Sequence, residues 1–295
     1  MSGPPGTGLG IAVASGMLRG VFGHGVLSAF EEAGLRAEVY GVASSSVLSG
    51  GLAAIGQARA VGVDYWQEAA EAARSRGMSR VARDTIDRYA PRLRAGLLTG
   101  SGPRLLLAAS RVSTAQAAEI TQGKGAARLG RQLLRDILAG DPGWAGANLE
   151  TVVFDSRPAG AVHRPLTEDN FDEVSYASTR MLHNWAVPAS VAGEAFVDAS
   201  YTCSCPAREV TATGVGRVVV ISAEPGPVHR DLYRSEEITE RSGAGLPAVR
   251  LIRPDSGLGE LGVDFATATA AGLDKAYSQG SAAGLRYLDT YGLDG

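Results

Sequence analysis

The stretch that decides the fold is Val39–Leu52, which reads VYGVASSSVLSGGL. Its opening VYGVA segment favours a β-strand, and from Val47 onward the apolar residues recur at the spacing of a helix. Three consecutive serines stand between these two parts. The stretch therefore predicts a strand, a tight turn and a helix, with Ser44 at the turn.

Ser44 is the candidate nucleophile in this turn. A serine between a strand and a helix is held out at the end of the sheet, and the first free amides of the helix point at the group that it attacks. The usual form of such a turn is G-x-S-x-G, but Val42 and Ser46 replace both glycines here. In the alternative, structural interpretation, the serines are small residues packed where a helix meets a sheet.

The segments around this turn predict a parallel sheet covered by helices. Leu9–Ala14 is a short apolar run typical of a buried strand, and a helix that closes at Gly34 follows it. Strand, helix and strand form a βαβ unit, in which the strands are parallel. Further strands are expected at 149–154, 194–198, 217–222 and 249–254, and helices at 174–182 and 265–288. We therefore expect one α/β domain over residues 1–295.

Region 65–139 has a different pattern, in which helices alternate with breaks and the β signal is weak. Helices are expected over 67–76, 79–89 and 126–138, with loops at 100–103 and 123–125. We expect this region to form a helical cap beside the sheet, next to a substrate cleft.

Composition limits the classes of partner and the compartment. Of the 295 residues, 45% are hydrophobic and 20% are charged, so the chain can bury an ordinary core. With a formal net charge of −3, the chain lacks the excess of basic residues that is typical of proteins that bind nucleic acid or an anionic membrane surface. Residues 1–8 lack the basic and apolar regions of a secretion signal, and no segment has the length of a membrane span. We therefore expect a cytoplasmic protein that does not bind nucleic acid.

Two features of the sequence suggest a phosphate site and a metal site, but we interpret both differently. Gly3–Gly8 looks like the start of a phosphate-binding loop, but no strand precedes it and no Lys-Ser or Lys-Thr pair follows it. We expect residues 1–8 to be a flexible tail. Cys203 and Cys205 are too close together for an unstrained disulfide, and no second ligand pair accompanies them for zinc. We expect free thiols, no metal and no cofactor.

Several motifs together resemble the patatin-like phospholipase family. That family has a glycine-rich G-G-G-x-R-G loop, a helix ending in E-E-A-G, a G-x-S-x-G turn and a late D-G-G or D-G-A segment. Here Ala14–Gly20 and Glu31–Gly34 stand in register with the turn at Ser44, and Val197–Ser200 carries the late aspartate. The likeness also covers Tyr176–Ser178 and Leu251–Asp255. The resemblance implies a three-layer α/β/α fold with a mainly parallel central sheet and a helical cap.

The resemblance also implies a catalytic dyad without histidine, formed by Ser44 and Asp198. In such a dyad the carboxylate accepts the serine proton during attack and returns it to the leaving group. The implied oxyanion-hole donors are the backbone amides of Ser15, Gly16, Met17 and Ser45. Arg19 is expected to anchor the loop. The implied activity is that of a serine acyl hydrolase of the lipase or phospholipase type, which acts on lipid esters through an acyl-enzyme.

The motifs depart from the family pattern at several positions. Ser15 and Met17 replace two glycines of the loop, and Ala199 follows the aspartate where glycine is usual. We expect Met17 and Val42 to narrow the site. Two alternatives to hydrolysis therefore stay open: acyl transfer in specialised metabolism, and a binding or regulatory protein with an inactive site. Transient contact with a membrane surface and the oligomeric state are open as well.

Other residues near the predicted site carry alternatives of their own. His229 follows Ser44 and Asp198 in the chain, so the Ser, Asp, His order of the α/β-hydrolases is available. A histidine packed on a helix is more often structural than catalytic, and we interpret His24 in this way. Trp185 is interpreted either as part of the core or as a wall of an acyl pocket.

Overall fold

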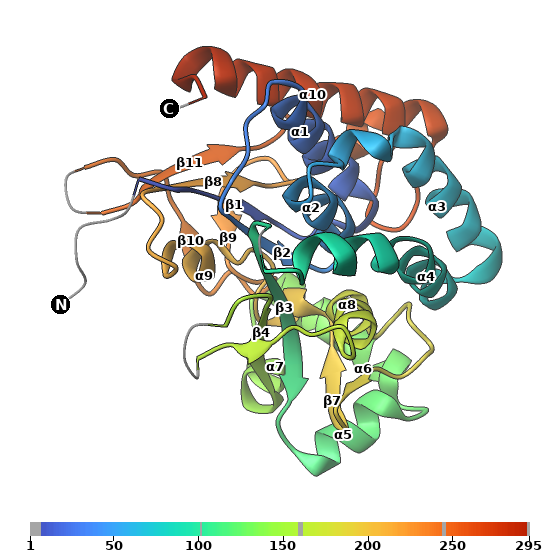
Figure 1. Cartoon of the computed structure of the whole chain (residues 1–295). Helices are drawn as coiled ribbons and strands as arrows, with labels where there is room; N and C mark the ends of the chain where they lie inside the picture. The colour runs from blue at the N-terminus through green and yellow to red at the C-terminus, as the bar shows by residue number, and fades with distance from the viewer. Residues whose placement is uncertain (1–6, 101, 159–161, 244–245, 294–295) are drawn as a thin grey trace.

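The computed structural model describes residues 7–100, 102–158, 162–243 and 246–293, and these form three layers (Figure 1). A nine-stranded sheet is the middle layer, and helices cover both of its faces. Seven strands follow one another in the order β11-β8-β1-β2-β3-β4-β5, while β7 attaches to β3 and β6 attaches to β7. The three-layer α/β/α fold that the sequence predicts is confirmed.

The sheet is mostly parallel. Its strands are β1 (Leu9–Val13), β2 (Val39–Ala43), β3 (Arg104–Val112), β4 (Leu149–Asp155), β5 (Arg164–Pro165), β6 (Ser190–Val191), β7 (Glu194–Val197), β8 (Arg217–Ile221) and β11 (Ala248–Ile252). All pairs from β11 through β8, β1 and β2 to β3 are parallel, whereas β3 is antiparallel to both β4 and β7. A separate two-stranded ribbon consists of β9 (Val228–His229) and β10 (Glu237–Ile238). The strands predicted from 149 onward agree with β4, β7, β8 and β11 to within two residues.

Along the described chain, helices alternate with these strands. They are α1 (Gly20–Glu32), α2 (Ser46–Ala54), α3 (Val63–Arg76), α4 (Met78–Leu97), α5 (Ala115–Gln122), α6 (Ala126–Ala139), α7 (Gly143–Asn148), α8 (Phe171–Thr179), α9 (Ala207–Thr211) and α10 (Ala270–Tyr291). Short 3-10 turns are η1 (Met17–Arg19), η2 (Ala58–Ala60), η3 (Ala199–Tyr201) and η4 (Leu258–Leu261). The last helix begins at Ala270 and not at the predicted residue 265.

Glycines allow α1 and α10 to pack in close contact on one face of the sheet. A Cβ atom at Gly25 would lie 2.1 Å from the carbonyl oxygen of Tyr277, and one at Gly280 would lie 2.0 Å from that of Phe22. Strands β1 and β2 are buried along their whole length, which explains why their sequences are continuous apolar runs.

The predicted helical cap over 65–139 is wrong in part, because β3 lies inside it. This strand is central to the sheet and pairs with β2 and β4 on its two sides. Its sequence, RLLLAASRV, consists largely of leucine, alanine and arginine, which are good helix formers, so local propensity concealed a strand that tertiary pairing stabilises.

The remaining helices of that range are present as predicted. Residues 67–76, 79–89 and 126–138 fall within α3, α4 and α6. Figure 1 shows that α3 and α4 lie together near α2, whereas α5 and α6 lie near β7. The range therefore contains two groups of helices separated by a core strand.

The structure also bears on the expectations about membrane spans, the cysteines, a metal site and the N-terminal tail. Among these residues, no helix is both long and apolar enough to cross a bilayer. Cys203 and Cys205 are buried free thiols, as predicted. Within the same residues, no cluster of His, Cys, Asp and Glu is arranged to hold a metal ion. Of the predicted N-terminal tail, residues 1–6 lie outside the described part of the chain.

Candidate active site

Ser44 and Asp198 meet because β2 and β7 run toward each other along one side of β3. Strand β2 is parallel to β3, and its last residue pairs with Ala108. Strand β7 is antiparallel to β3, and its last residue pairs with Ser110. Strand β4 occupies the other side of β3. The residues that follow β2 and β7 therefore face each other, although they are far apart in the sequence.

The two side chains are hydrogen-bonded, and the aspartate is fixed from several sides. The Ser44 hydroxyl donates to Oδ2 of Asp198 at 2.8 Å, and the amide of Ser200 donates to Oδ1 at 2.8 Å. The Asp198 amide donates to the carbonyl of Arg180 at 2.9 Å, and the Ser110 hydroxyl donates to the Asp198 carbonyl at 2.8 Å. The carboxyl group is thus oriented toward the serine by both its side chain and its backbone.

Burial makes Asp198 a stronger base than an exposed aspartate. The residue is completely buried, and this burial raises the pKa of its carboxyl group to about 6, against the opposing effect of the hydrogen bonds from Ser200 and Ser44. Desolvation destabilises the charged form, so the carboxylate accepts a proton more readily. A group with such a pKa is suited to general-base catalysis near neutral pH.

Ser44 occupies a strained turn that is held without the two glycines of the usual pattern. Its φ angle is +56°, in the left-handed region that residues other than glycine seldom adopt. The Ser44 amide donates to Oγ of Ser178 at 2.8 Å. The hydroxyl of Ser46 accepts from the amide of Ala43 at 2.9 Å and lies 2.9 Å from the carbonyl oxygen of Val13. Side-chain hydrogen bonds therefore stabilise the sharp bend.

Val42 does not narrow the site, so that prediction is wrong. Its side chain is completely buried under α2, where a Cβ atom at Gly50 would lie 2.3 Å from Cγ1 of Val42. The glycine that the turn lacks is matched by a glycine on the helix above it. Met17, by contrast, does line the cavity beside the nucleophile.

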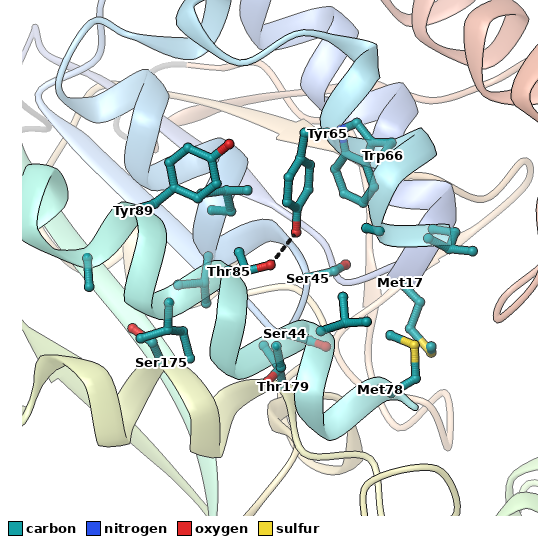
Figure 2. Close-up of a pocket in the computed structure, with 18 of the residues that line it drawn as sticks. Met17, Ser44, Ser45, Tyr65, Trp66, Met78, Thr85, Tyr89, Ser175 and Thr179 are labelled. Carbon is teal, nitrogen blue, oxygen red and sulfur yellow. Dashed lines mark hydrogen bonds between the residues drawn. The ribbon is translucent and has the colours of Figure 1, made fainter. Parts of the chain in front are cut away.

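An apolar cavity lies beside Ser44, between α2, α3, α4 and α8 (Figure 2). It contains about 770 Å³ of empty space, part of which is open to solvent. Its aromatic and sulfur-containing lining residues are Met17, Tyr65, Trp66, Met78, Tyr89, Phe171 and Trp185. Trp185 therefore belongs to the cavity wall as well as to the buried core. The composition of the lining suits a hydrocarbon chain.

Two of the four predicted oxyanion-hole amides are already engaged, which corrects the prediction for these residues. The Ser15 amide donates to the carbonyl of Ser204 at 2.8 Å, and the Gly16 amide donates to Oγ of Ser45 at 3.2 Å. The amides of Met17 and Ser45 have no acceptor within the described residues. Met17 has a φ angle of +47°, so backbone strain occurs in this loop as well as at the nucleophile.

Arg19 connects the loop after β1 to two distant segments. Its guanidinium group forms an ion pair with Glu224, which follows β8, and lies 3.8 Å from a carboxylate oxygen of Asp264. These contacts agree with the predicted role as a loop anchor. Arg19 is not among the residues that line the cavity.

The histidines do not join the dyad. The carboxylate oxygens of Asp198 accept from Ser44 and Ser200, and within the described part of the chain no histidine is hydrogen-bonded to either dyad member. His24 is buried, which lowers its pKa to about 4, and its Nδ1 atom accepts from the indole N–H of Trp66 at 2.8 Å. These contacts support the structural interpretation of His24. His229 lies in the β9–β10 ribbon.

Sequence reasoning missed the residues that hold the dyad in place. Ser178, Ser110 and Arg180 contact the backbone of the two dyad residues. Only Ser178 carried a signal, because it belongs to a motif of the resemblance. Ser110 lies on β3 and Arg180 follows α8. Their proximity to the dyad depends on tertiary structure.

No model of a known protein family matches the chain, and no curated protein matches it in sequence. The likeness to patatin-like phospholipases therefore remains a resemblance, based on the motifs.

Proposed function

We propose that this protein is a serine acyl hydrolase in which Ser44 is the nucleophile and Asp198 is the general base. The observation that supports this most directly is the 2.8 Å hydrogen bond from the Ser44 hydroxyl to the buried Asp198 carboxylate, beside an apolar cavity. A nucleophile bonded to a base that is itself oriented by a third group is the arrangement expected for covalent catalysis. Here the amide of Ser200 provides that orientation.

The reaction proceeds in two halves. Oγ of Ser44 attacks the ester carbonyl carbon while its proton passes to Oδ2 of Asp198. The tetrahedral intermediate collapses when Asp198 gives that proton to the leaving alcohol, which leaves the acyl group on Ser44. Water then attacks the acyl-enzyme, its proton passes to Asp198 and from there to Oγ of Ser44, and the acid is released. Both halves use the same carboxylate as base and acid.

The cavity supports an ester with an apolar acyl chain as the substrate. Its wall contains aromatic, aliphatic and methionine side chains, and the described hydroxyls at the wall include those of Ser44 and Ser45 (Figure 2). Burial of an alkyl chain there would contribute about 0.8 kcal/mol per methylene group. Lipid esters, which the resemblance implies, fit this lining.

Labelling with a fluorophosphonate probe tests the proposal. We expect an adduct on Ser44 in the wild-type protein, none in Ser44→Ala and a strongly slowed reaction in Asp198→Asn. Ser49→Ala is the matched control, because Ser49 is buried on α2 and its hydroxyl has no partner in the described chain. Absence of an adduct from folded wild-type protein would contradict the proposal and favour a binding role. If labelling succeeds, product analysis of a p-nitrophenyl ester with and without an added alcohol distinguishes hydrolysis from acyl transfer.

A further inference from the structure

The hydroxyl of Ser45 is placed to act on a substrate in the cavity. Ser45 directly follows the nucleophile and lines the same cavity. Its Oγ atom accepts the Gly16 amide at 3.2 Å, while its own proton has no acceptor within the described residues. A hydroxyl carries one donor hydrogen in addition to its lone pairs. The Ser45 O–H is therefore available to a group bound beside Ser44.

The surroundings of Ser45 leave room for this hydroxyl and limit its movement. A Cβ atom at Gly20 would lie 3.2 Å from the Ser45 Oγ and 3.0 Å from the ring of Trp66. The absence of a side chain at Gly20 thus lets α1 begin close to the hydroxyl. Together with the Gly16 amide, these neighbours restrict the space in which the Ser45 side chain can rotate.

We propose that the Ser45 hydroxyl is a catalytic hydrogen-bond donor to the oxyanion. This inference rests on the proposed function, because an oxyanion forms only if Ser44 attacks a carbonyl group. The Gly16 amide donates to the Ser45 oxygen, and the Ser45 O–H donates to the negatively charged oxygen of the tetrahedral intermediate. The hydrogen stays on Ser45 throughout, so no proton is transferred.

The chain of two hydrogen bonds explains how an engaged amide still contributes to the site. An N–H that donates to a hydroxyl oxygen polarises its O–H bond, and this strengthens the next hydrogen bond. The amides of Ser45 and Met17, which have no acceptor among the described residues, would add to this set of donors. The positive end of the α2 helix dipole acts in the same direction.

An opposite role for the same contact makes a different prediction. If the Ser45 hydroxyl only blocked the Gly16 amide, its removal would release that amide and increase the rate. If the hydroxyl instead donates to the oxyanion, its removal lowers the rate. The direction of the change in Ser45→Ala therefore separates the two roles.

Steady-state kinetics of Ser45→Ala with a p-nitrophenyl ester test the proposal. We expect kcat to fall about 100-fold with little change in KM, since one oxyanion donor typically contributes two to three orders of magnitude. Ser45→Thr, which keeps a hydroxyl, should recover most of the rate. Ser49→Ala lies one turn farther along α2 and should behave as wild type.

A thionoester comparison provides a readout that a merely structural role would not change. Sulfur is a weaker hydrogen-bond acceptor than oxygen, so wild-type protein should strongly prefer an oxoester over the matching thionoester. That preference should shrink in Ser45→Ala. An active wild-type protein whose Ser45→Ala variant shows an unchanged or higher kcat and an unchanged preference would overturn this inference alone. A wild-type protein with neither ester turnover nor a fluorophosphonate adduct would overturn the proposed function and this inference with it.

Discussion

Asp198 holds the hydroxyl of Ser44 at 2.8 Å through a carboxyl group that is completely buried. Burial raises the pKa of that carboxyl group to about 6, and only its ionised form can act as the base. We therefore expect kcat/KM to rise with pH through about 6 and to level off above it. A pH–rate profile with an ester whose leaving group does not titrate measures this. A rise centred near pH 4 would contradict the raised pKa of Asp198.

The same pKa shift predicts that Asp198 destabilises the folded protein at neutral pH. The folded-state pKa of about 6 lies above the usual value of 3.8, so the folded protein binds a proton that the unfolded chain releases between these values. The free energy of unfolding should therefore fall as pH rises across this window. Asp198→Asn removes the buried charge and should be more stable than wild type at pH 7, by up to about 3 kcal/mol. Urea unfolding at pH 4 and pH 7 tests this, and the difference should vanish near pH 4.

Asp155 provides a control with the opposite sign. Burial alone would raise its pKa, but hydrogen bonds from Arg104, Arg157 and His163 lower it overall. Its ionised form therefore stabilises the folded state above the usual aspartate pKa, and this contribution is lost as pH falls through the lowered value. We expect Asp155→Asn to be less stable than wild type at pH 7. If both asparagine variants changed stability in the same direction, the burial argument for Asp198 would fail.

The sequence predicted the nucleophile and its base for different reasons. Ser44 follows from local pattern, because a strand, three serines and a helix can be recognised without tertiary information. Asp198 came from the resemblance, since an aspartate after a strand is usually a turn or helix cap. That the two meet depends on β7 running against β3, and neither strand's own sequence specifies that pairing. Non-local pairing also explains why β3 itself was missed.

The positions of side chains within the site were less predictable than the positions of the helices and strands. The spacing of the motif placed Val42 at the site, but packing against Gly50 turns it into the core. The sequence suggested that the amides of Ser15 and Gly16 are available to a substrate. In the structure, the Ser15 amide donates to the carbonyl of Ser204, which is 189 positions away in the chain. The Gly16 amide donates to the hydroxyl of Ser45, which is 29 positions away. Such competition between hydrogen-bond partners can be seen only in three dimensions.

Ser46 should contribute to stability by replacing the glycine of the usual turn. Its hydroxyl accepts the amide of Ala43 at 2.9 Å in a fully buried position. Ser46→Ala leaves that amide without its acceptor, and we expect a loss of about 1–3 kcal/mol in the free energy of unfolding. Chemical denaturation measures this. Ser49→Ala should change stability much less, because the Ser49 hydroxyl has no partner among the described residues. Equal effects of the two substitutions would contradict the role of Ser46.

The final prediction concerns the length of acyl chain that the cavity accepts. The hydroxyl of Tyr65 on α3 and Oγ1 of Thr85 on α4 lie 3.2 Å apart, and Figure 2 shows this bond between two residues of the cavity lining. Both residues also line a second cavity of about 410 Å³ between the same helices. Its charged lining residues are Glu68, Arg76, Asp84 and Arg88. Tyr65 and Thr85 therefore belong to the wall that the apolar cavity shares with the polar one.

Thr85→Ala should open this wall and lengthen the space that an acyl chain can enter. We expect the ratio of kcat/KM for p-nitrophenyl palmitate to that for p-nitrophenyl butyrate to rise several-fold in this variant. Thr85→Val is the matched control, because it keeps the shape of threonine while removing its hydroxyl. A rise in Thr85→Ala alone would show that side-chain volume sets the limit, whereas an equal rise in both variants would assign it to the hydrogen bond with Tyr65. If neither variant changes the ratio, the pair does not form the end of the acyl pocket.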